Sequence, residues 1–358
     1  MPSCYSERRV CSRGHWRDLK GTTKMAEGKN NRKPPRRFGP PSRPPAAFTL
    51  IELLVSTVIF ILILGLVIAI MSSASSLWLR HRNQSVAFES ANAAFETLTR
   101  TLGQAVLNTY WEVKNNSYGR SSELHFTMGP TVDLLGSGSS QEFPGEAVFF
   151  QAILGRPTDS SLRRLPLLVN GVGYFVHFDD GPANPAFLDS VVTPRHRFRL
   201  YEWLQPTEQL EVYGDTSGKS WFRNSLSAGV MANSNVLAEN VIGLVLLAEY
   251  PDANGTIIPS YLYDSRDDTT PQSLHQLPPR IRVTMVVIDE SSAIRLAEKY
   301  SAAAPPIQPD ATWFQDPQEF GADLDLWENR LKSASPKINY RIFTATVIIQ
   351  NAKWSVNP

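Results

Sequence analysis

Cysteine and proline are missing from the parts of the sequence where they would most constrain the fold. The only two cysteines, Cys4 and Cys11, lie within the first 47 of 358 residues. The rest of the chain therefore cannot form an internal disulfide, and its stability must come from packing. No proline occurs between Pro45 and Pro130, so this interval can hold one uninterrupted helix.

Charge is almost absent from one long apolar segment. From Phe48 to Met71 the sequence has 24 residues and a single ionisable side chain, Glu52. A helix of that length measures about 36 Å, which exceeds a hydrocarbon core of about 30 Å. A charge inside a bilayer costs about 2.5–3.5 kcal/mol, so an intramembrane Glu indicates a function and a partner. We therefore predict that residues 48–71 span a membrane and that Glu52 has a specific role.

Basic residues are concentrated before this segment. Residues 1–47 contain 12 Lys/Arg and 3 Asp/Glu, a net charge of +9, which leaves −8 for the remainder of a chain whose total is +1. The positive-inside rule places the basic flank in the cytoplasm and the acidic remainder across the membrane. Because the flank is rich in Pro, Gly and Arg, we expect residues 1–47 to be a disordered leader. Met25 is an alternative start that keeps six of its basic residues.

Ordinary export signals explain the apolar segment incompletely. A cleaved secretory signal has an apolar stretch of only 7–15 residues, although Ser72, Ala74 and Ser75 resemble its cleavage site. No lipobox cysteine follows, and Arg8 and Arg9 lie too far upstream for a twin-arginine signal. A plain signal anchor explains the length and the flanks but leaves Glu52 without a role.

The residues around Glu52 form a more specific pattern. A basic leader ends at Ala47 and is followed by the sequence FTLIELLVS, which starts at Phe48. This arrangement resembles the type IV prepilin signature, in which a prepilin peptidase cuts before the Phe and methylates the new amine. The family usually has Gly before the cut, and Ala47 is the nearest small substitute. The resemblance implies cleavage between Ala47 and Phe48, an N-methylphenylalanine at Phe48, and motif roles for Thr49, Leu50, Ile51 and Leu53.

The resemblance also gives Glu52 a partner. Glu52 occupies the fifth position of the implied mature chain. In the family, the Glu at this position neutralises the terminal amine of a neighbouring subunit during assembly. Removing one partner of such a buried pair costs about 3–5 kcal/mol. The implied partners are the prepilin peptidase and methylase, other pilin or pseudopilin subunits, an inner-membrane assembly platform and membrane lipid. No catalytic residue, cofactor or metal is implied.

Helical spacing continues beyond Met71. Apolar residues three and four positions apart form a stripe that comprises Phe88, Ala91, Phe95, Leu98, Leu102 and Ala105/Val106. We predict one helix from Phe48 to Val106, with residues 48–71 in the membrane and an amphipathic half, residues 72–108, packed on a sheet. A coiled-coil partner is the alternative for the stripe. Many pilins have a helix-kinking proline in the membrane half, which this chain lacks, so a straighter helix is expected.

Residues 109–358 have the pattern of an extracytoplasmic β-rich domain. Short alternating or β-branched runs predict strands at Glu123–Met128, Ala147–Leu154, Gly173–Phe178, Phe198–Leu204, Val241–Tyr250, Ile281–Ile288 and Ile342–Ile349. The run Ile281–Ile288 fits a half-buried strand, and helices are expected at Ser292–Ala303 and Ala322–Ala334. The predicted fold class is α+β, a pilin-like lollipop with a long N-terminal helix on an antiparallel β-sheet with loop insertions.

Three further stretches resemble known families. VLAENVIGLVLLAEY and LPPRIRVTMVVIDE resemble the helix-to-strand segment and the following strand of J-type minor pseudopilins of type II secretion. The matched residues are Leu237, Val241, Leu244, Leu277, Pro278, Ile281, Arg282 and Val283. The closing NYRIFTATVIIQNAKW and the length resemble the Verru_Chthon cassette protein C family.

Motifs for catalysis or metal binding are not found. The histidines His81, His125, His177, His196 and His275 are scattered, so each is expected at the surface or partly buried. YPDANGTIIP lacks the later acidic ligand of an EF-hand, so a turn is expected there. Aspartates such as Asp264 and Asp323 are expected to solvate loops.

PRHRFRLYEW combines basic and aromatic residues in the manner of a nucleic-acid surface. Strand alternation sends Arg197 and Arg199 to one face and Phe198 and Leu200 to the other, which predicts a solvated face over a core face. Because the domain charge is also −8, we do not expect a nucleic-acid partner.

The sequence therefore predicts a minor pilin or pseudopilin that enters, or initiates, a type IV pilus-like or type II secretion filament. It would lie in the bacterial inner membrane with its C-terminal domain in the periplasm, and later in a periplasmic or surface filament. The alternative is an extracytoplasmic enzyme or a ligand- or DNA-binding domain on a simple signal anchor.

Overall fold

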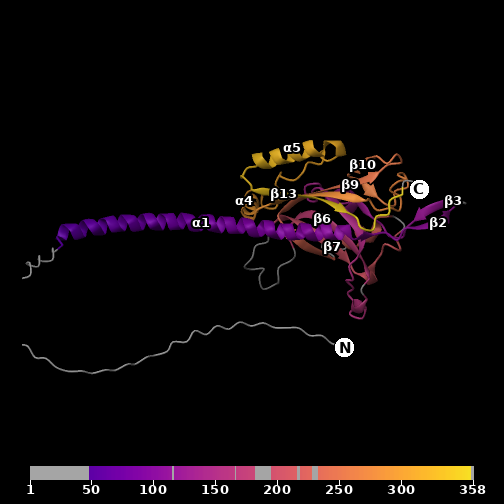
Figure 1. The fold of residues 1–358 in the computed structure, drawn as a ribbon, viewed down its shortest axis with the longest axis horizontal. Helices are drawn as coiled ribbons and strands as arrows, with labels where there is room; N and C mark the ends of the chain where they lie inside the picture. The colour runs from indigo at the N-terminus through magenta and orange to yellow at the C-terminus, as the bar shows by residue number, and fades with distance from the viewer. Residues whose placement is uncertain are drawn as a thin grey trace, which may run out of the picture. The chain divides into compact units, whose positions relative to one another are not determined.

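The computed structural model describes residues 48–114, 117–165, 167–181, 195–215, 218–227 and 233–355, with the backbone alone at residues 76–87, 114, 117 and 227. The predicted leader, residues 1–47, lies outside the described residues. One long helix, α1, spans Leu50–Gly103 (Figure 1). The chain divides into two units between Leu64 and Gly65, inside this helix.

The C-terminal end of α1 differs from the prediction. The stripe predicted a helix to Val106, but α1 ends at Gly103, and Ala105–Val106 form strand β1. This strand pairs with β5 (Glu146–Ile153), with Ala105 opposite Ala152. Gly103 favours the ending because glycine is a poor helix former and because its carbonyl accepts a hydrogen bond from Gln350 N.

The remainder of the chain is built on antiparallel sheets, which confirms the α+β class. The prediction of a single sheet is wrong, because two larger sheets and a hairpin are present. The first sheet has the order β11-β4-β5-β6-β7-β8, with β1 beside β5. Its other strands are β4 (Thr127–Pro130), β6 (Val169–Asp179), β7 (Arg197–Gln205), β8 (Ser234–Glu239) and β11 (Tyr263–Asp264).

The second sheet has four strands in the order β10-β9-β12-β13. They are β9 (Val241–Pro251), β10 (Ile257–Ser260), β12 (Arg280–Ile288) and β13 (Tyr340–Ile348). Strands β2 (Tyr110–Lys114) and β3 (Ser117–Ser121) form the separate hairpin. The shorter helices are α2 (Thr131–Leu135), α3 (Ser220–Ser227), α4 (Glu290–Tyr300) and α5 (Phe320–Ser333). Single 3₁₀ turns occur at Leu162–Arg164, Thr207–Gln209 and Pro317–Glu319.

Most predicted elements of the domain are confirmed. The strands expected from Ala147 onward correspond to β5, β6, β7, β9, β12 and β13, and the two expected helices correspond to α4 and α5. The strand expected at Glu123–Met128 begins only at Thr127. The turn expected at YPDANGTIIP connects β9 to β10, where Asp252 Oδ1 accepts the N–H groups of Asn254 and Thr256 at 2.8 Å.

The helix implied by the resemblance to J-type pseudopilins is absent. Ser234–Glu239 is instead the edge strand β8, paired with β7. Asn240 follows with a φ of 64°, a conformation that asparagine tolerates better than most residues. This reversal leads the chain directly from the first sheet into β9 of the second.

Side chains on the first sheet alternate between two cores. Val148 and Phe150 of β5 point into a core shared with α1 and the second sheet, while Phe149 belongs to the other core. Phe149 stacks on Phe222 of α3, with ring centroids 4.1 Å apart. Trp221 also belongs to this second core. The central strands are therefore buried on both faces.

The predicted stripe on α1 packs inside its own domain, as expected. Ala91, Leu98 and Leu102 are buried in the shared core. The ring of Phe95 lies 5.7 Å from that of Phe343 on β13. These contacts account for the stripe without a coiled-coil partner.

The prediction that β12 is half-buried is wrong. Thr284 and Val286, on the face expected to be polar, are also buried. Trp327 of α5 covers this face, because a Cβ added to Gly243, which pairs with Val286, would lie 2.8 Å from its indole. The covering helix comes late in the chain and cannot be read from the strand's own sequence.

The two sheets touch where β5 begins. Strand β10 pairs only with Ala248–Pro251, so most of that edge of β9 lacks a strand neighbour among the described residues. Gly145 forms a bridge to Leu244, and a Cβ at Gly145 would lie 2.3 Å from the Leu244 carbonyl oxygen. Glu146 accepts a hydrogen bond from Leu246 N. These contacts provide hydrogen-bonding partners for part of the β9 edge that has no neighbouring strand.

Glu146→Gln is expected to stabilise the protein at neutral pH. Burial raises the pKa of Glu146 well above its ordinary value of 4.5, although the hydrogen bond from Leu246 opposes the shift. The folded chain therefore holds a proton that the unfolded chain releases, and stability falls as the pH rises from about 4.5 towards the folded pKa. Glutamine keeps an acceptor for Leu246 N and cannot ionise. Thermal unfolding of both proteins should show a higher midpoint for the variant near pH 7 and a smaller difference near pH 4; a difference independent of pH would contradict this account.

Candidate functional site

The residues of the prepilin-like motif lie at the start of α1. Ala47 lies outside the described residues. Phe48 precedes the helix and is 84% exposed, and Leu50, Ile51 and Leu53 are exposed in its first turns. The side chains of the motif are therefore exposed within the described residues.

Glu52 has a partner that the sequence reasoning missed. Thr49 N and Thr49 Oγ1 each donate to Glu52 Oε2 at 2.9 Å, and Glu52 N donates to Thr49 Oγ1 at 3.4 Å. This reciprocal arrangement is a capping box, which satisfies backbone N–H groups at a helix start. The spacing Thr-x-x-Glu was a signal available in the sequence. Glu52 therefore caps its own helix before any second chain is considered.

The segment after the capping box has the length and composition to cross a membrane. The helical stretch Leu50–Ser75 contains an 18-residue window with a mean hydropathy of 3.2, and none of that window is buried within the structure. Its hydroxyl groups bond to backbone carbonyls three residues earlier: Ser56 to Leu53, Thr57 to Leu54 and Ser72 to Ala69. These bonds leave no hydroxyl proton of the three without an acceptor, as a hydrocarbon environment requires.

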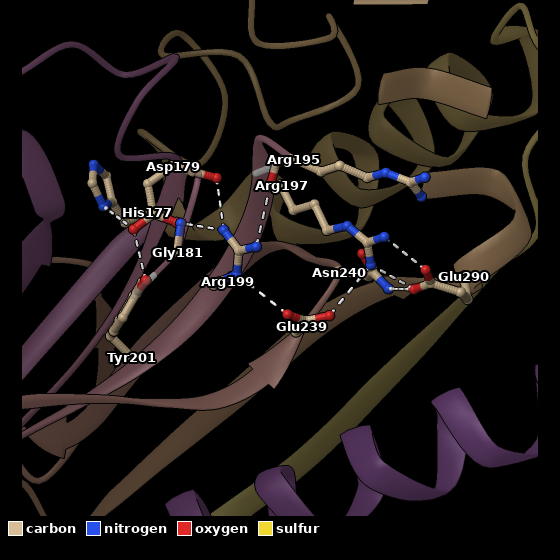
Figure 2. Close-up of polar contacts among 10 residues, drawn as sticks. All are labelled: His177, Asp179, Gly181, Arg195, Arg197, Arg199, Tyr201, Glu239, Asn240 and Glu290. Carbon is tan, nitrogen blue, oxygen red and sulfur yellow. Dashed lines mark hydrogen bonds and ion pairs between the residues drawn. The ribbon is translucent and has the colours of Figure 1, made fainter. Parts of the chain in front are cut away.

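Arg197 and Arg199 of PRHRFRLYEW lie in a charge network instead of on a solvated face (Figure 2). Arg197 donates from Nη1 and Nη2 to the two oxygens of Glu290 at 2.6 and 2.7 Å. Arg199 Nη1 donates to Asp179 Oδ1 at 2.7 Å, and its Nε lies 3.4 Å from Glu239 Oε1. The Arg197 and Arg199 side chains are only 10% and 6% exposed. The expected solvated face is therefore wrong, because partners distant in sequence cover it.

The network joins parts of the domain that meet only in the folded chain. Arg199 connects β7 with the end of β6, and Arg197 connects β7 with the first turn of α4. Asn240 Nδ2 also donates to Glu290, at 3.0 Å, from the turn between the sheets. Gly181 leaves room for Arg199, because a Cβ there would lie 2.9 Å from its guanidinium carbon.

Asp179 is held as a carboxylate inside this network. Burial opposes its ionisation, but hydrogen bonds from His177, Tyr201 and Arg199 outweigh burial and lower the pKa of Asp179. Tyr201 Oη donates to Asp179 Oδ2 at 2.6 Å. Because Arg197 and Arg199 are already paired, neither presents a free cation to phosphate. The geometry favours a structural role over nucleic-acid binding.

His125 is completely buried, which corrects the expectation of a surface or partly buried histidine. Trp221 Nε1 donates to its Nδ1 at 3.0 Å, and its Nε2 lies 2.7 Å from Asp264 Oδ1. Since Nδ1 accepts, the ring proton is on Nε2 and points at Asp264. Burial lowers the pKa of His125. Both nitrogens are occupied, so this pair stabilises the second core and offers no free base.

Other candidate residues also have structural contacts. Asp323, expected to solvate a loop, is buried and accepts from Phe314 N at 2.8 Å. Of the residues matched to J-type pseudopilins, Val241, Leu244, Ile281 and Val283 are core residues, and Arg282 bonds to Glu249 at 2.8 Å. No group of three potential metal-ligating side chains occurs in the part of the chain that the structure describes.

Comparison with known proteins gives limited similarity. No protein-family profile matches the sequence, and no curated protein matches it. A search of solved structures finds a type IV-like pilin from Thermus thermophilus, with 11% identity and a TM-score of 0.33. The match covers 75% of this chain and 96% of that one. Similarity at this level assigns neither a family nor a function to the chain.

Proposed function

We propose that the chain is a structural subunit of a type IV pilin-like filament, either a minor pilin or a pseudopilin. A prepilin peptidase would cut between Ala47 and Phe48 and methylate the amine of Phe48. The mature subunit would then enter, or initiate, a pilus-like or type II secretion filament through α1. Its action would be assembly, without catalysis.

One observation carries this proposal. A motif of the prepilin type, Phe48–Leu53, lies at the exposed, capped start of an apolar helix with the length to cross a bilayer. A pilin-like subunit needs such a segment before cleavage as a membrane anchor and after cleavage as a surface for packing against other helices. A plain anchor explains the apolar length and the capping by Glu52, but it does not account for the rest of the motif around Phe48.

The basic flank and the apolar segment also support a proposed location for each part of the chain. The basic flank would stay in the cytoplasm, residues 48–71 would lie in the bacterial inner membrane, and the β-rich domain would lie in the periplasm. The partners would be the prepilin peptidase, the assembly platform, membrane lipid and neighbouring subunits whose terminal amines meet Glu52.

The alternative remains a periplasmic enzyme or ligand-binding domain on a simple anchor. Removal of the leader distinguishes the two, since a signal anchor keeps it. A cavity lined by Glu146 favours ligand binding, and a filament subunit can also carry it.

We expect the N-terminal peptide of the mature protein to begin at N-methylated Phe48. Mass spectrometry of the protein from cells with and without an active prepilin peptidase would measure this, and the uncut leader should persist only in the second strain. Ala47→Lys, which places a bulky charged group at the cut, should retain the leader in both. An intact leader in both strains, or cleavage near Ser75, would contradict the proposal.

A further inference from the structure

A cavity of about 300 Å³ lies within the Gly65–Pro358 unit. One wall comes from α2 and the residues before β5, and the other comes from the connection between α4 and α5. Phe143, Trp313 and Phe314 contribute aromatic surface, and the buried residues Glu146 and Val245 also line it. Its volume lies at the lower end of the range for small-molecule sites, about 300–1,000 Å³.

The ionisable side chains that line this cavity are all acidic. Asp133, Glu146 and Asp310 line it, and no Lys, Arg or His occurs among its described lining residues. Glu146 is only 5% exposed. Within the described residues its carboxyl receives one hydrogen bond, from Leu246 N to Oε2. The carboxyl therefore has an oxygen available to a ligand and has no counter-charge of its own.

The aromatic wall is positioned without a ligand. The Arg330 guanidinium lies 4.1 Å from the centroid of the Trp313 ring and 3.2 Å from Asp310 Oδ2. Phe314 is held between Tyr261 and Trp327, with centroids 6.1 Å away in each case. A flat apolar group can therefore enter a site whose walls are already ordered, which reduces the entropic cost of binding.

We propose that this cavity binds an organic ammonium ion, with its NH₃⁺ group against Glu146 and its apolar part against Trp313 and Phe314. An ammonium ion against this carboxyl favours its ionised form, so binding releases the proton that the buried Glu146 holds and an ion pair forms. A neutral molecule of the same shape gains only the aromatic contacts. This binding function is separate from filament assembly and does not depend on it.

A purely structural role of Glu146, as an acceptor for the free edge of β9, makes a different prediction. That role needs one oxygen atom and no negative charge, so Glu146→Gln preserves it. Cation binding needs the negative charge of Glu146, so Glu146→Gln should abolish the binding. Glu319→Gln is the matched control, because Glu319 is exposed, lies outside the cavity lining and makes no side-chain cap.

Calorimetry with the full chain in lipid nanodiscs tests the proposal with two probes, benzylammonium and its neutral analogue benzyl alcohol. The wild type and Glu319→Gln should bind benzylammonium at least tenfold more tightly than benzyl alcohol, and Glu146→Gln should lose this preference. Ala311→Trp, which fills the cavity and leaves Glu146 intact, should abolish binding, and this second variant decides the matter if Glu146→Gln does not fold. Equal affinity of the wild type for both probes, no binding of either, or an unchanged preference in a folded Glu146→Gln or Ala311→Trp variant would overturn the proposal.

Discussion

Glu52→Gln is expected to leave the protein in the membrane and to reduce its amount in sheared filaments about 100-fold or more. Removing one partner of a buried ion pair costs about 3–5 kcal/mol, and each 1.4 kcal/mol is about a factor of ten. Glutamine at this position still forms a capping box. The substitution therefore removes the charge and keeps the bonds to Thr49 that the structure shows. Immunoblots of sheared filaments and of washed membranes would measure the ratio.

Thr49→Ala is the matched control for this experiment. It removes the capping hydroxyl, at a cost of about 0.5–2 kcal/mol, and leaves the Glu52 carboxylate in place. We expect this variant to enter filaments and Glu52→Ala to be excluded like Glu52→Gln. If Thr49→Ala and Glu52→Ala are both excluded while Glu52→Gln enters normally, Glu52 acts by capping its own helix and the pairing with a neighbouring amine is refuted.

Arg199→Ala should produce a large loss of stability in the folded domain. It leaves Asp179 buried without its guanidinium partner, and also removes the contact with Glu239. Breaking a buried pair in this way costs about 3–5 kcal/mol, which corresponds to a decrease of roughly 10 °C in the midpoint of thermal unfolding. Near-UV circular dichroism of the full chain in nanodiscs would measure it.

Arg195→Ala provides the control for this substitution. Arg195 is exposed at the start of the same stretch, so its removal should change the unfolding midpoint by less than about 2 °C. A double variant, Asp179→Asn with Arg199→Met, should recover part of the loss because it leaves no uncompensated charge. Equal effects of Arg195→Ala and Arg199→Ala would show that the network does not stabilise the domain.

Several features could be predicted because their signals are local. The apolar run with one carboxylate predicted a helix with the length to span a membrane, and α1 has that helix. Short alternating or β-branched runs predicted β5, β7 and β9 to within about two residues, and Pro305 and Pro306 set a limit to α4. The Thr49–Glu52 capping box is equally local, because its two residues lie three positions apart.

Short elements were harder to predict. Strand β8 contains VLAE, which suits a helix in isolation, but its pairing with β7 and the reversal at Asn240 decide for a strand. Strand β1 forms because β5 provides an edge for Ala105 and Val106. In both cases the hydrogen bonds come from segments tens of residues away. The residues next to β8 and β1 in sequence therefore do not determine that these segments form strands.

By itself the sequence determined a capped, apolar first helix, an amphipathic continuation, an acidic domain rich in strands and a motif of the prepilin type, since periodicity and composition are properties of neighbouring residues. Only the tertiary structure decided that the strands form two sheets, that Arg197 and Arg199 are buried in ion pairs and that Glu146 lines a cavity. These outcomes depend on which distant groups cover a side chain. The free-energy cost of a charge depends on how deeply it is buried and on its ion-pair partner. Both are fixed only when the chain has folded.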